Sequence, residues 1–593
     1  MTNREIADLF EKVADMLAIR GDSIHRILAY RRAAESIRAL GRDVQVVAQE
    51  GGLTDIPGIG QTLADKIEEM LATGRLQFYE KLSQDVPPSL VTLLRVEGLG
   101  PKRVKAVYET LNITTLAQLT EAARAGDLRK LPGMGEKSEA KLLVAIEALA
   151  RHGDDRTPLG DAWPIAQAIL AELAALPGVS QVAVGGSLRR MRETIGDIDL
   201  LVAAEDAPPI MAHFCGMERV ETVLGQGPTK SSVVLLNGLQ VDLRVLPAGR
   251  WGTLLSYFTG SKEHNVRLRE LALKQGLSLN EHAFRPVGDT PAGTPDEILC
   301  PTEEAVYQTL GLPYILPTLR EDRGEIEAAL AGRLPDVVRS SDIVADLHMH
   351  TTWSDGKLSV LEMAQAAQAR GRQYIVITDH SASLGIANGL SVERLRQQAA
   401  EVRAADAALG PDFRVFHGTE MEIRADGTLD YPDEVLAELD FVIASLHTSL
   451  SQPRAQVTAR ALAAIDNPHV DMLAHPTGRL LPDRPGADLD MDAVLFAASR
   501  TGTILEINAH PRRLDLRDSH VRRAVDLGVW LAINCDAHDE ADFEMLHYGV
   551  ATAQRGWATA ANVVNTWPLA RFLAYLRRHG PAAGSAPLRG GLL

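Results

Sequence analysis

The chain has few cysteines, few aromatic residues and no long apolar run. Its 593 residues include three cysteines, Cys215, Cys300 and Cys535, which lie far apart and form no CxxC pair. This spacing argues against a disulfide framework or a zinc–thiolate site, and we expect a reducing, cytoplasmic location. No apolar run is long enough to cross a bilayer, so we expect no membrane association. The first residues also lack the apolar segment of a secretory signal.

The chain also has no excess of basic residues over acidic ones. The 61 Lys and Arg residues against 78 Asp and Glu give a formal net charge of −17. This balance disfavours a protein that coats nucleic acid by charge alone. Nucleic acid is not excluded as a partner, because phosphate contacts need only local basic patches. The length and a hydrophobic content of 46% indicate several domains with real cores.

Three aspartates in strand-forming segments are the most informative pattern present. Asp197 and Asp199 lie in Asp-Ile-Asp-Leu-Leu-Val, and Asp242 lies in the apolar run Val-Asp-Leu-Arg-Val. Residues two apart on a strand point the same way, so the first two carboxylates face one point. Three carboxylates on paired strands suit Mg²⁺, and two such ions can activate a hydroxyl and stabilise a leaving pyrophosphate. Gly186 and Ser187 supply backbone amides and a hydroxyl for a triphosphate, so the pattern predicts nucleotidyl transfer.

A Gly-x-Gly turn recurs in the first part of the chain. The copies are Gly58 with Gly60, Gly98 with Gly100 and Lys102, and Gly133 with Gly135 and Lys137. Each copy precedes an amphipathic helix, which is the helix-hairpin-helix pattern. The glycines free backbone amides at a helix N-terminus, where the N–H groups and the dipole bind a phosphate. We predict DNA contacts that do not read the base sequence. The alternative is a set of tight turns between packed helices.

A second set of potential metal ligands follows short apolar strands in the last part of the chain. Strands and Ala-rich helices alternate there, as in a βα barrel. The ligands are His348, His350, Asp355, His380, Glu420, His447, His475, Asp536 and His538. Imidazole and carboxylate without thiolate suit Zn²⁺, Mn²⁺ or Fe²⁺. Because the set exceeds the needs of one ion, we expect a cluster of two or three metals that acts on phosphate esters. His510 could be another ligand, an outer group or neither.

Together these motifs resemble the bacterial family X DNA polymerases, relatives of DNA polymerase β that carry a C-terminal PHP (polymerase and histidinol phosphatase) domain. The resemblance covers nearly the whole chain. It implies that Asp197 and Asp199 bind both Mg²⁺ ions and that Asp242 joins them at the catalytic ion. For the barrel it implies Mn²⁺-dependent removal of nucleotides from a 3′ end, with incision at abasic sites as an extension.

The resemblance also assigns residues to the nucleotide. Ser187 and Arg190 match positions that contact the incoming triphosphate. Tyr257, Phe258 and Gly260 resemble a turn that faces the sugar and disfavours its 2′-hydroxyl.

Further matches concern the nascent base pair, the template and the first domain. Asn265 and Arg269 match positions near the nascent pair and the template strand. Lys262 stands where the animal enzymes have an acid, and it could contact the nucleotide. Lys66 matches the Schiff-base lysine of the deoxyribose-phosphate lyase domain. A plain grip on a 5′-phosphate is the alternative role for this residue.

We predict a multidomain chain with α-helical helix-hairpin-helix domains, an α+β nucleotidyltransferase palm and a C-terminal distorted (βα)7-type α/β barrel. The predicted segments are 1–82 (lyase-like), 83–153 (duplex-binding), 154–247 (palm), 248–317 (nucleotide selection), 318–341 (linker) and 342–593 (PHP).

The predicted function is a DNA repair polymerase that fills short gaps, with a tethered 3′-5′ exonuclease or phosphoesterase. Its partners would be gapped or nicked duplex DNA and dNTPs, and we expect a monomer. Three alternatives stay open. One is a phosphatase for a small phosphate ester with a nucleic-acid-binding N-terminal half. The others are a non-catalytic scaffold for DNA ends and an RNA-directed nucleotidyltransferase.

Overall fold

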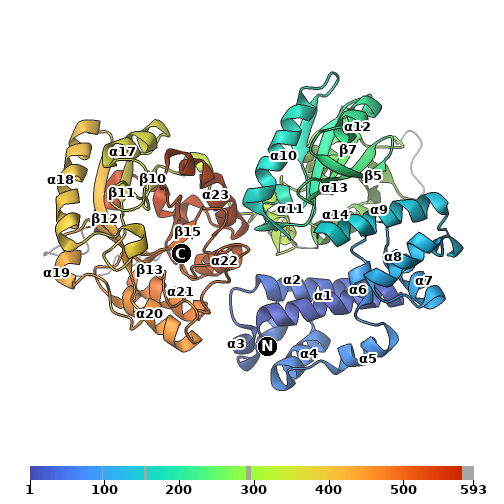
Figure 1. Cartoon of the computed structure of the whole chain (residues 1–593), viewed down its shortest axis with the longest axis horizontal. Helices are drawn as coiled ribbons and strands as arrows, with labels where there is room; N and C mark the ends of the chain where they lie inside the picture. The colour runs from blue at the N-terminus through green and yellow to red at the C-terminus, as the bar shows by residue number, and fades with distance from the viewer. Residues whose placement is uncertain (97, 132, 153–155, 289–294, 577–593) are drawn as a thin grey trace. The chain divides into compact units, whose positions relative to one another are not determined.

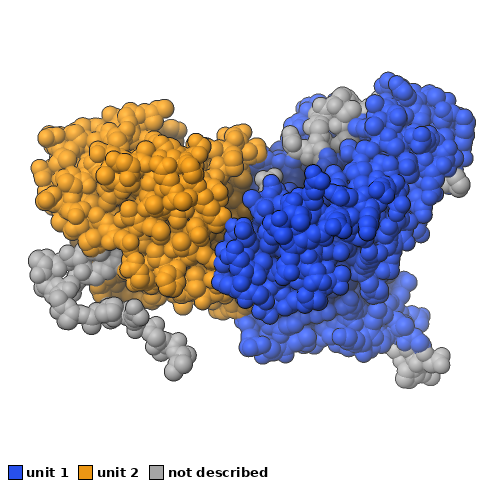
Figure 2. All heavy atoms as spheres, turned by 90° about the horizontal axis from the view of Figure 1, so that it is seen from below, with its two compact units in different colours: residues 1–334 blue, residues 335–593 orange. Residues whose placement is uncertain are grey.

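The computed structural model describes residues 1–96, 98–131, 133–152, 156–288 and 295–576. The chain divides into two compact units, residues 1–334 and residues 335–593 (Figure 2). None of the described helices combines the length and the apolar character needed to cross a membrane.

The first unit begins with helices around one apolar core. They are α1 (Asn3–Arg20), α2 (Ile24–Ala39), α3 (Val44–Gln49), α4 (Gln61–Thr73), α5 (Gln77–Asp85), α6 (Leu90–Leu93), α7 (Pro101–Leu111), α8 (Leu116–Ala125) and α9 (Glu136–His152). Local sequence sets their ends. Thr2 and Glu5 form a capping box at the start of α1, and Gly21 ends that helix in the left-handed conformation. Buried Phe10, Leu17 and further apolar residues at helical spacing then join the helices.

The repeated glycine turns lead directly into helices. Gly58, Gly98 and Gly133 have φ angles of +82°, +83° and +74°, a region that glycine adopts without a steric penalty. Gly60 and Gly100 are the N-cap residues of α4 and α7, and neither helix start has a side-chain cap. Backbone N–H groups at these helix starts are therefore available to an anion. Lys102 is exposed on α7, whereas the side chain of Lys137 lies outside the described structure.

A five-stranded sheet forms the palm, in the order β2-β4-β7-β6-β5. Its strands are β2 (Gln181–Val184), β4 (Ile198–Ala203), β5 (Val220–Gln226), β6 (Lys230–Leu235) and β7 (Gln240–Leu246). Strands β4 and β7 run parallel. Helix α10 (Leu159–Ala174) packs against β2 and β4, and α12 (Ala207–Cys215) packs against β5, β6 and β7 (Figure 1). A short two-stranded ladder pairs β1 (Thr157–Pro158) with β3 (Thr194–Ile195).

The next segment forms helices and a small hairpin. It contains α13 (Trp251–Thr259), α14 (Lys262–Lys274), β8 (Leu277–Leu279), β9 (Phe284–Pro286), α15 (Glu303–Thr309) and α16 (Glu325–Leu330).

Most of the stretch predicted as a linker, residues 318–341, packs inside the first unit instead. Arg320 is fully buried and donates to Glu303 Oε1 at 2.6 Å. Glu325 is also fully buried, and its Oε1 lies 2.6 Å from His264 Nδ1. The charges are tolerated because each meets a buried partner. The boundary between the units therefore falls after residue 334, before the predicted start of the PHP segment at 342.

The second unit is the predicted α/β barrel. Seven parallel strands follow in chain order: β10 (Ala345–Asp346), β11 (Tyr374–Ile377), β12 (Arg414–Glu422), β13 (Phe441–Ser445), β14 (Met472–Leu473), β15 (Ile504–Asn508) and β16 (Leu531–Asn534) (Figure 1). The connecting helices include α17 (Val360–Ala369), α18 (Val392–Leu409), α20 (Arg454–Asp466), α21 (Met491–Thr501) and α22 (Asp518–Asp526). The segments after β10 and β16 meet at a Met349–Ala537 bridge, where His350 N donates to Ala537 O at 2.8 Å. This contact joins the first and last strands.

Helix α24 (Leu569–Leu576) covers the amino ends of the barrel strands. Its Phe572 is fully buried, with its ring centroid 4.6 Å from that of Tyr374, 5.4 Å from Phe416 and 5.9 Å from Phe441. Tyr374 and Phe441 are the first residues of β11 and β13, so this aromatic cluster lies opposite the strand ends that carry the predicted ligands.

We expect Phe572→Ala to lower the free energy of unfolding of the second unit by about 3–5 kcal/mol, because the change leaves a cavity in an aromatic cluster. Urea unfolding followed by circular dichroism measures the change. Phe496→Ala is the matched control, because Phe496 is 66% exposed and its loss should cost less than about 0.5 kcal/mol. Equal effects of the two substitutions would contradict the packing described here.

Candidate active sites

Two adjacent strands bring the three predicted aspartates together. Asp199 on β4 is the register partner of Asp242 on β7, and Asp197 immediately precedes β4. Burial, followed by the Asp242 carboxylate, raises the pKa of Asp197. Burial, followed by the Asp197 and Asp242 carboxylates, raises the pKa of Asp199 to about 8. A divalent cation relieves this kind of crowding, so the oxygen ligands fit Mg²⁺.

The Asp242 carboxylate contacts a lysine on β6 and a glutamine on β7. Its Oδ2 lies 2.8 Å from Lys230 Nζ, and its Oδ1 accepts from Gln240 Nε2 at 3.1 Å. Among the described residues, the groups whose ligand atoms all lie within 4.8 Å of one another belong to the barrel. The three palm carboxylates are thus close together but do not meet at one point. The ammonium group of Lys230 occupies part of the space beside Asp242 that a metal ion would take.

Gly186 is required by the approach of α11 (Gly186–Arg189) to the acids. It has a φ of +58°, and a Cβ at this position would collide with Asp199 Oδ2. The preceding Gly185 N donates to Asp199 O at 2.7 Å. Ser187 follows at once and is half-buried. The Gly-Ser pair therefore lies directly against the carboxylates.

Arg190 donates hydrogen bonds to other residues of the protein. This buried residue donates from Nε to Glu321 Oε1 at 3.0 Å and from Nη1 to Thr259 O at 2.6 Å. Gly260 lies against the same guanidinium, since a Cβ there would approach Arg190 Nη1 to 3.0 Å. A triphosphate contact by Arg190 would have to replace the Glu321 carboxylate.

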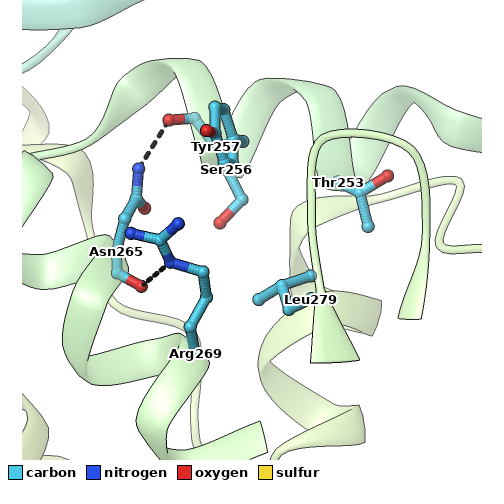
Figure 3. A pocket seen from close by; sticks show the side chains of 6 residues that line it. All are labelled: Thr253, Ser256, Tyr257, Asn265, Arg269 and Leu279. Carbon is cyan, nitrogen blue, oxygen red and sulfur yellow. Dashed lines mark hydrogen bonds between the residues drawn. The ribbon is translucent and has the colours of Figure 1, made fainter. Parts of the chain in front are cut away.

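Three predicted nucleotide and template residues line one pocket at the junction of α13 and α14. Tyr257, Asn265 and Arg269 share it with Thr253, Ser256 and Leu279 (Figure 3). Asn265 Nδ2 donates to Tyr257 O at 2.6 Å, and Arg269 Nε donates to Asn265 O at 3.3 Å. These bonds fix the side chains along one wall.

Phe258 and Lys262 lie outside this pocket lining. The Phe258 ring stacks under Arg244, whose Cζ lies 4.4 Å from its centroid. Lys262 begins α14, and its side chain is exposed. Partial desolvation, followed by the Arg31 charge, lowers its pKa.

Lys66 lies beside an aromatic ring in the helical part of the first unit. Its Nζ is 5.1 Å from the centroid of Phe78, and Arg26 Cζ is 4.9 Å from the same centroid. Two cations at one ring form a local basic patch that suits a phosphate. A lyase role for Lys66 stays a prediction.

The predicted barrel ligands meet at the carboxyl ends of the strands. They form four overlapping groups: His350, Asp355, His380 and His538; His348, Glu420 and His475; His348, His350 and Asp536; and His380, Glu420 and His447. Within each group the ligand atoms lie within 4.8 Å of one another. All nine predicted residues take part, and the shared members indicate adjoining ion positions.

Buried polar atoms in these groups support metal binding. Glu420 Oε1 lies 3.0 Å from His475 Nε2 and Glu420 Oε2 lies 2.8 Å from His380 Nδ1, but these contacts lack hydrogen-bond geometry. Buried polar atoms in such contacts are costly, and a metal ion between them would satisfy both partners. Burial alone would raise the pKa of Glu420, but His447, His348 and His380 hold it well below its usual range. The ionised carboxylate is the form that binds a metal.

Several outer residues were missed by the sequence analysis. Glu506 Oε1 lies 2.7 Å from His348 Nδ1, and its Oε2 accepts from His475 N at 2.7 Å. Glu422 Oε2 lies 2.8 Å from His447 Nδ1. Such carboxylates fix the orientation of ligating rings. The available signal was an acid inside an apolar strand at Glu506, and a second acid two residues after Glu420.

Two nearby residues stand outside the ligand groups. His510 Nδ1 accepts from Arg512 N at 3.2 Å. Cys535 is fully buried, with Sγ 3.8 Å from Phe543 O, which agrees with a packing role.

Binding of Mg²⁺ to the palm should release protons at neutral pH. The pKa of Asp199 is raised from 3.8 to about 8, so its carboxyl is mostly protonated at pH 7 and must ionise to bind a cation. The apparent affinity for Mg²⁺ should therefore rise about tenfold per pH unit from pH 6 and level off above pH 8. Calorimetric titrations in two buffers of different ionisation enthalpy measure the proton release. Asp199→Asn should remove it, and a pH-independent affinity would contradict the prediction.

Comparison with known proteins agrees with this architecture. Family models match the helix-hairpin-helix domain at residues 1–76, the SAM-like helix-hairpin-helix tandem at 90–148, the DNA polymerase beta thumb at 254–321 and the PHP domain at 346–508.

Curated relatives match both units. The chain is 38% identical to the DNA polymerase/3′-5′ exonuclease PolX of Bacillus subtilis over 98% of this chain and 100% of that protein. It is 28% identical to DNA polymerase lambda of Rattus norvegicus over 54% of this chain and 56% of that protein. It is 29% identical to a probable phosphatase of Thermoanaerobacter over 38% of this chain and 91% of that protein. The chain thus belongs to the bacterial family X DNA polymerases that carry a C-terminal PHP domain.

Proposed function

We propose that this chain is a DNA repair polymerase that fills short gaps and carries a 3′-5′ exonuclease in its barrel. The observation that carries the proposal is the adjacency of Asp197, Asp199 and Asp242 on parallel strands, with Gly186 against them. The relation to the Bacillus polymerase/exonuclease over the full length supports it.

In the palm, each residue has a distinct part. Asp197 and Asp199 would hold Mg²⁺, and Asp242, whose carboxylate now lies against Lys230, would join them. Bound Mg²⁺ would activate the primer 3′-hydroxyl and stabilise the departing pyrophosphate. Ser187 and the adjacent backbone amides bind the triphosphate, because Gly186 allows a close approach.

The sugar and the base would meet the wall formed by α13 and α14. Tyr257 and Phe258 crowd the ribose edge, and Gly260 lets the chain turn between the helices with a φ of +69°. Asn265 and Arg269 orient the nascent pair and the template. Lys262 contributes a positive charge beside the nucleotide.

The barrel would remove nucleotides from a 3′ end. His348, His475 and the other barrel ligands would hold two or three Mn²⁺ or Zn²⁺ ions, which would supply an activated water and charge stabilisation. Glu506 and Glu422 keep the His348 and His447 rings in their ligating orientation. The hydrolysis places a water oxygen on phosphorus and breaks the bond to the preceding sugar. A nucleoside 5′-monophosphate then leaves.

The helical region would position the substrate. The turns at Gly58, Gly98 and Gly133 would bind phosphates on both sides of a gap or nick, and Lys102 and Lys137 would add positive charge there. We propose a monomer. The three cysteines are free, which suits the reducing cytoplasm.

Substitutions confined to one site should separate the two activities. Asp242→Ala should abolish primer extension and leave 3′ degradation unchanged, because it removes only a palm ligand. His348→Ala combined with His350→Ala should have the opposite effect. A labelled one-nucleotide gapped duplex, incubated with Mg²⁺ or Mn²⁺ and with or without dNTPs, measures both outcomes. Primer extension by the Asp242→Ala variant at the wild-type rate would contradict the assignment of polymerase catalysis to the palm aspartates.

The same assay, run beside a phosphate-release assay on a small monoester, tests a second candidate function. The match to a probable phosphatase over 91% of its length favours a barrel that hydrolyses small phosphate esters. In that case the chain would release phosphate from a small monoester and leave the 3′ end of DNA intact.

Tyr257→Ala should increase ribonucleotide incorporation by about tenfold or more, because loss of the ring opens space at the ribose edge. Single-nucleotide insertion with dCTP or CTP gives the ratio of kcat/KM values. Tyr257→Phe is the control, since it keeps the ring and should keep the selectivity. A Tyr257→Ala ratio equal to that of the wild type would rule out the role of the ring.

A further inference from the structure

An arginine outside the ligand set lies beside the barrel cluster. Arg513 belongs to the loop between β15 and α22, and its side chain is only 19% exposed. Its Nε lies 3.7 Å from Oδ2 of the metal ligand Asp536. Its Nη1 is buried and has no hydrogen-bond partner. A buried guanidinium nitrogen without a partner is costly, and a ligand that accepts a hydrogen bond from it would remove that cost.

The backbone of this loop is held firmly by the segment after β14. Arg479 Nε donates to Arg513 O at 2.7 Å, and Leu481 N donates to Arg512 O at 2.6 Å. Thr477 N and Oγ1 donate to Asp515 Oδ2 at 3.0 and 2.8 Å. The position of Arg513 is therefore built into the fold and does not depend on its own side-chain contacts.

The nearest acid is already committed to other partners. Asp536 Oδ2 accepts from Asn508 Nδ2 at 3.0 Å, and Asp536 Oδ1 lies 3.1 Å from His350 Nε2. The separation of 3.7 Å from Arg513 Nε is too long for a hydrogen bond. Asp536 thus gives Arg513 only a long-range attraction.

The loop after β14, which lies beside Arg513, contributes a positive charge near it. Arg484 points its Nε and Nη2 at Gly478 O, at 3.0 and 2.6 Å, and so offers no acid. Burial, followed by the charge of Arg513, lowers the pKa of Arg484. Metal ions in the neighbouring groups would add further positive charge. An anionic ligand that joined both the guanidinium and the metal ions would be stabilised by this positive charge.

We propose that Arg513 binds a non-bridging oxygen of the phosphate that the barrel hydrolyses, with Nη1 as a donor. This inference rests on the proposed exonuclease function and adds a substrate-binding residue to it. A guanidinium suits this task because its planar donors match the oxygens of a phosphate. The same contact would hold the phosphate of a nucleoside 5′-monophosphate product, and it would bind free inorganic phosphate.

The test uses the full chain loaded with Mn²⁺ and three variants. Arg513→Met keeps the apolar stem and removes the charge, and Arg513→Lys restores a charge. Arg512→Met is the matched control, because the Arg512 side chain is 53% exposed and pairs with Asp483 at the surface. The measurements are kcat and KM for 3′ removal from a labelled strand, the inhibition constant of inorganic phosphate, and the manganese content per chain.

Arg513→Met should raise both KM and the phosphate inhibition constant by about 10- to 100-fold, the loss expected for a hydrogen bond to a charged group. The manganese content should stay unchanged. Arg513→Lys should recover part of the phosphate affinity, and Arg512→Met should stay within about twofold of the wild type.

Two results would overturn the inference: an unchanged phosphate inhibition constant in Arg513→Met, or a loss of manganese that accounts for the weaker binding. If Arg513→Met does not fold, an unchanged inhibition constant in Arg513→Gln overturns it equally. If the wild type degrades no DNA, the proposed function fails by itself. Calorimetric binding of inorganic phosphate to the manganese-loaded wild type and Arg513→Met then decides the role of Arg513 alone.

Discussion

Burial of carboxylates and imidazoles close to one another is the constraint on which both sites depend. In the palm, burial, followed by the Asp197 and Asp242 carboxylates, raises the pKa of Asp199 to about 8. In the barrel, Glu420 is buried among His447, His348 and His380, and its Oε1 lies 3.0 Å from His475 Nε2. Parallel strands in an apolar core fix the backbone from which these side chains extend, so the side chains stay near one another even where they change rotamer.

The two sites meet this constraint in different ways. The palm keeps Asp242 with Lys230 and Gln240, so its ligands can gather when a metal ion and a nucleotide arrive. The barrel surrounds its ligands with fixed partners such as Glu506 and Glu422. The first arrangement suits a site that assembles with each substrate, and the second suits a site that keeps its ions.

Buried ion pairs connect the nucleotide site to the rest of the first unit. Arg190 meets Glu321, whose other oxygen lies 3.1 Å from Arg192 Nη1. The same Arg192 nitrogen lies 3.1 Å from Glu35 on α2. The residue expected to contact the triphosphate is thus linked through charges to the helices that would hold the DNA. These pairs also explain why the charged stretch around Glu321 packs in the first unit and does not form a linker.

Local sequence was sufficient for much of the protein. Period-two alternation placed Asp197 and Asp199 on one side of a strand, and strand ends marked His348 and Asp536 as ligands. Glycine spacing marked the helix starts at Gly60 and Gly100. These features could be predicted because each depends on a few neighbouring residues. The bounds of the linker could not, because burial of Arg320 requires Glu303, which lies in another helix.

Tertiary structure alone decided which distant groups meet. The Met349–Ala537 bridge brings the ligands of the first and last strands together, and strand register sets Asp199 opposite Asp242. Three further contacts were also set by the tertiary structure alone. They join Arg190 to Glu321, His348 to Glu506 and Arg513 to Asp536. Such contacts join residues far apart in the chain. They result from the packing of whole elements, for which local propensity and spacing carry no signal.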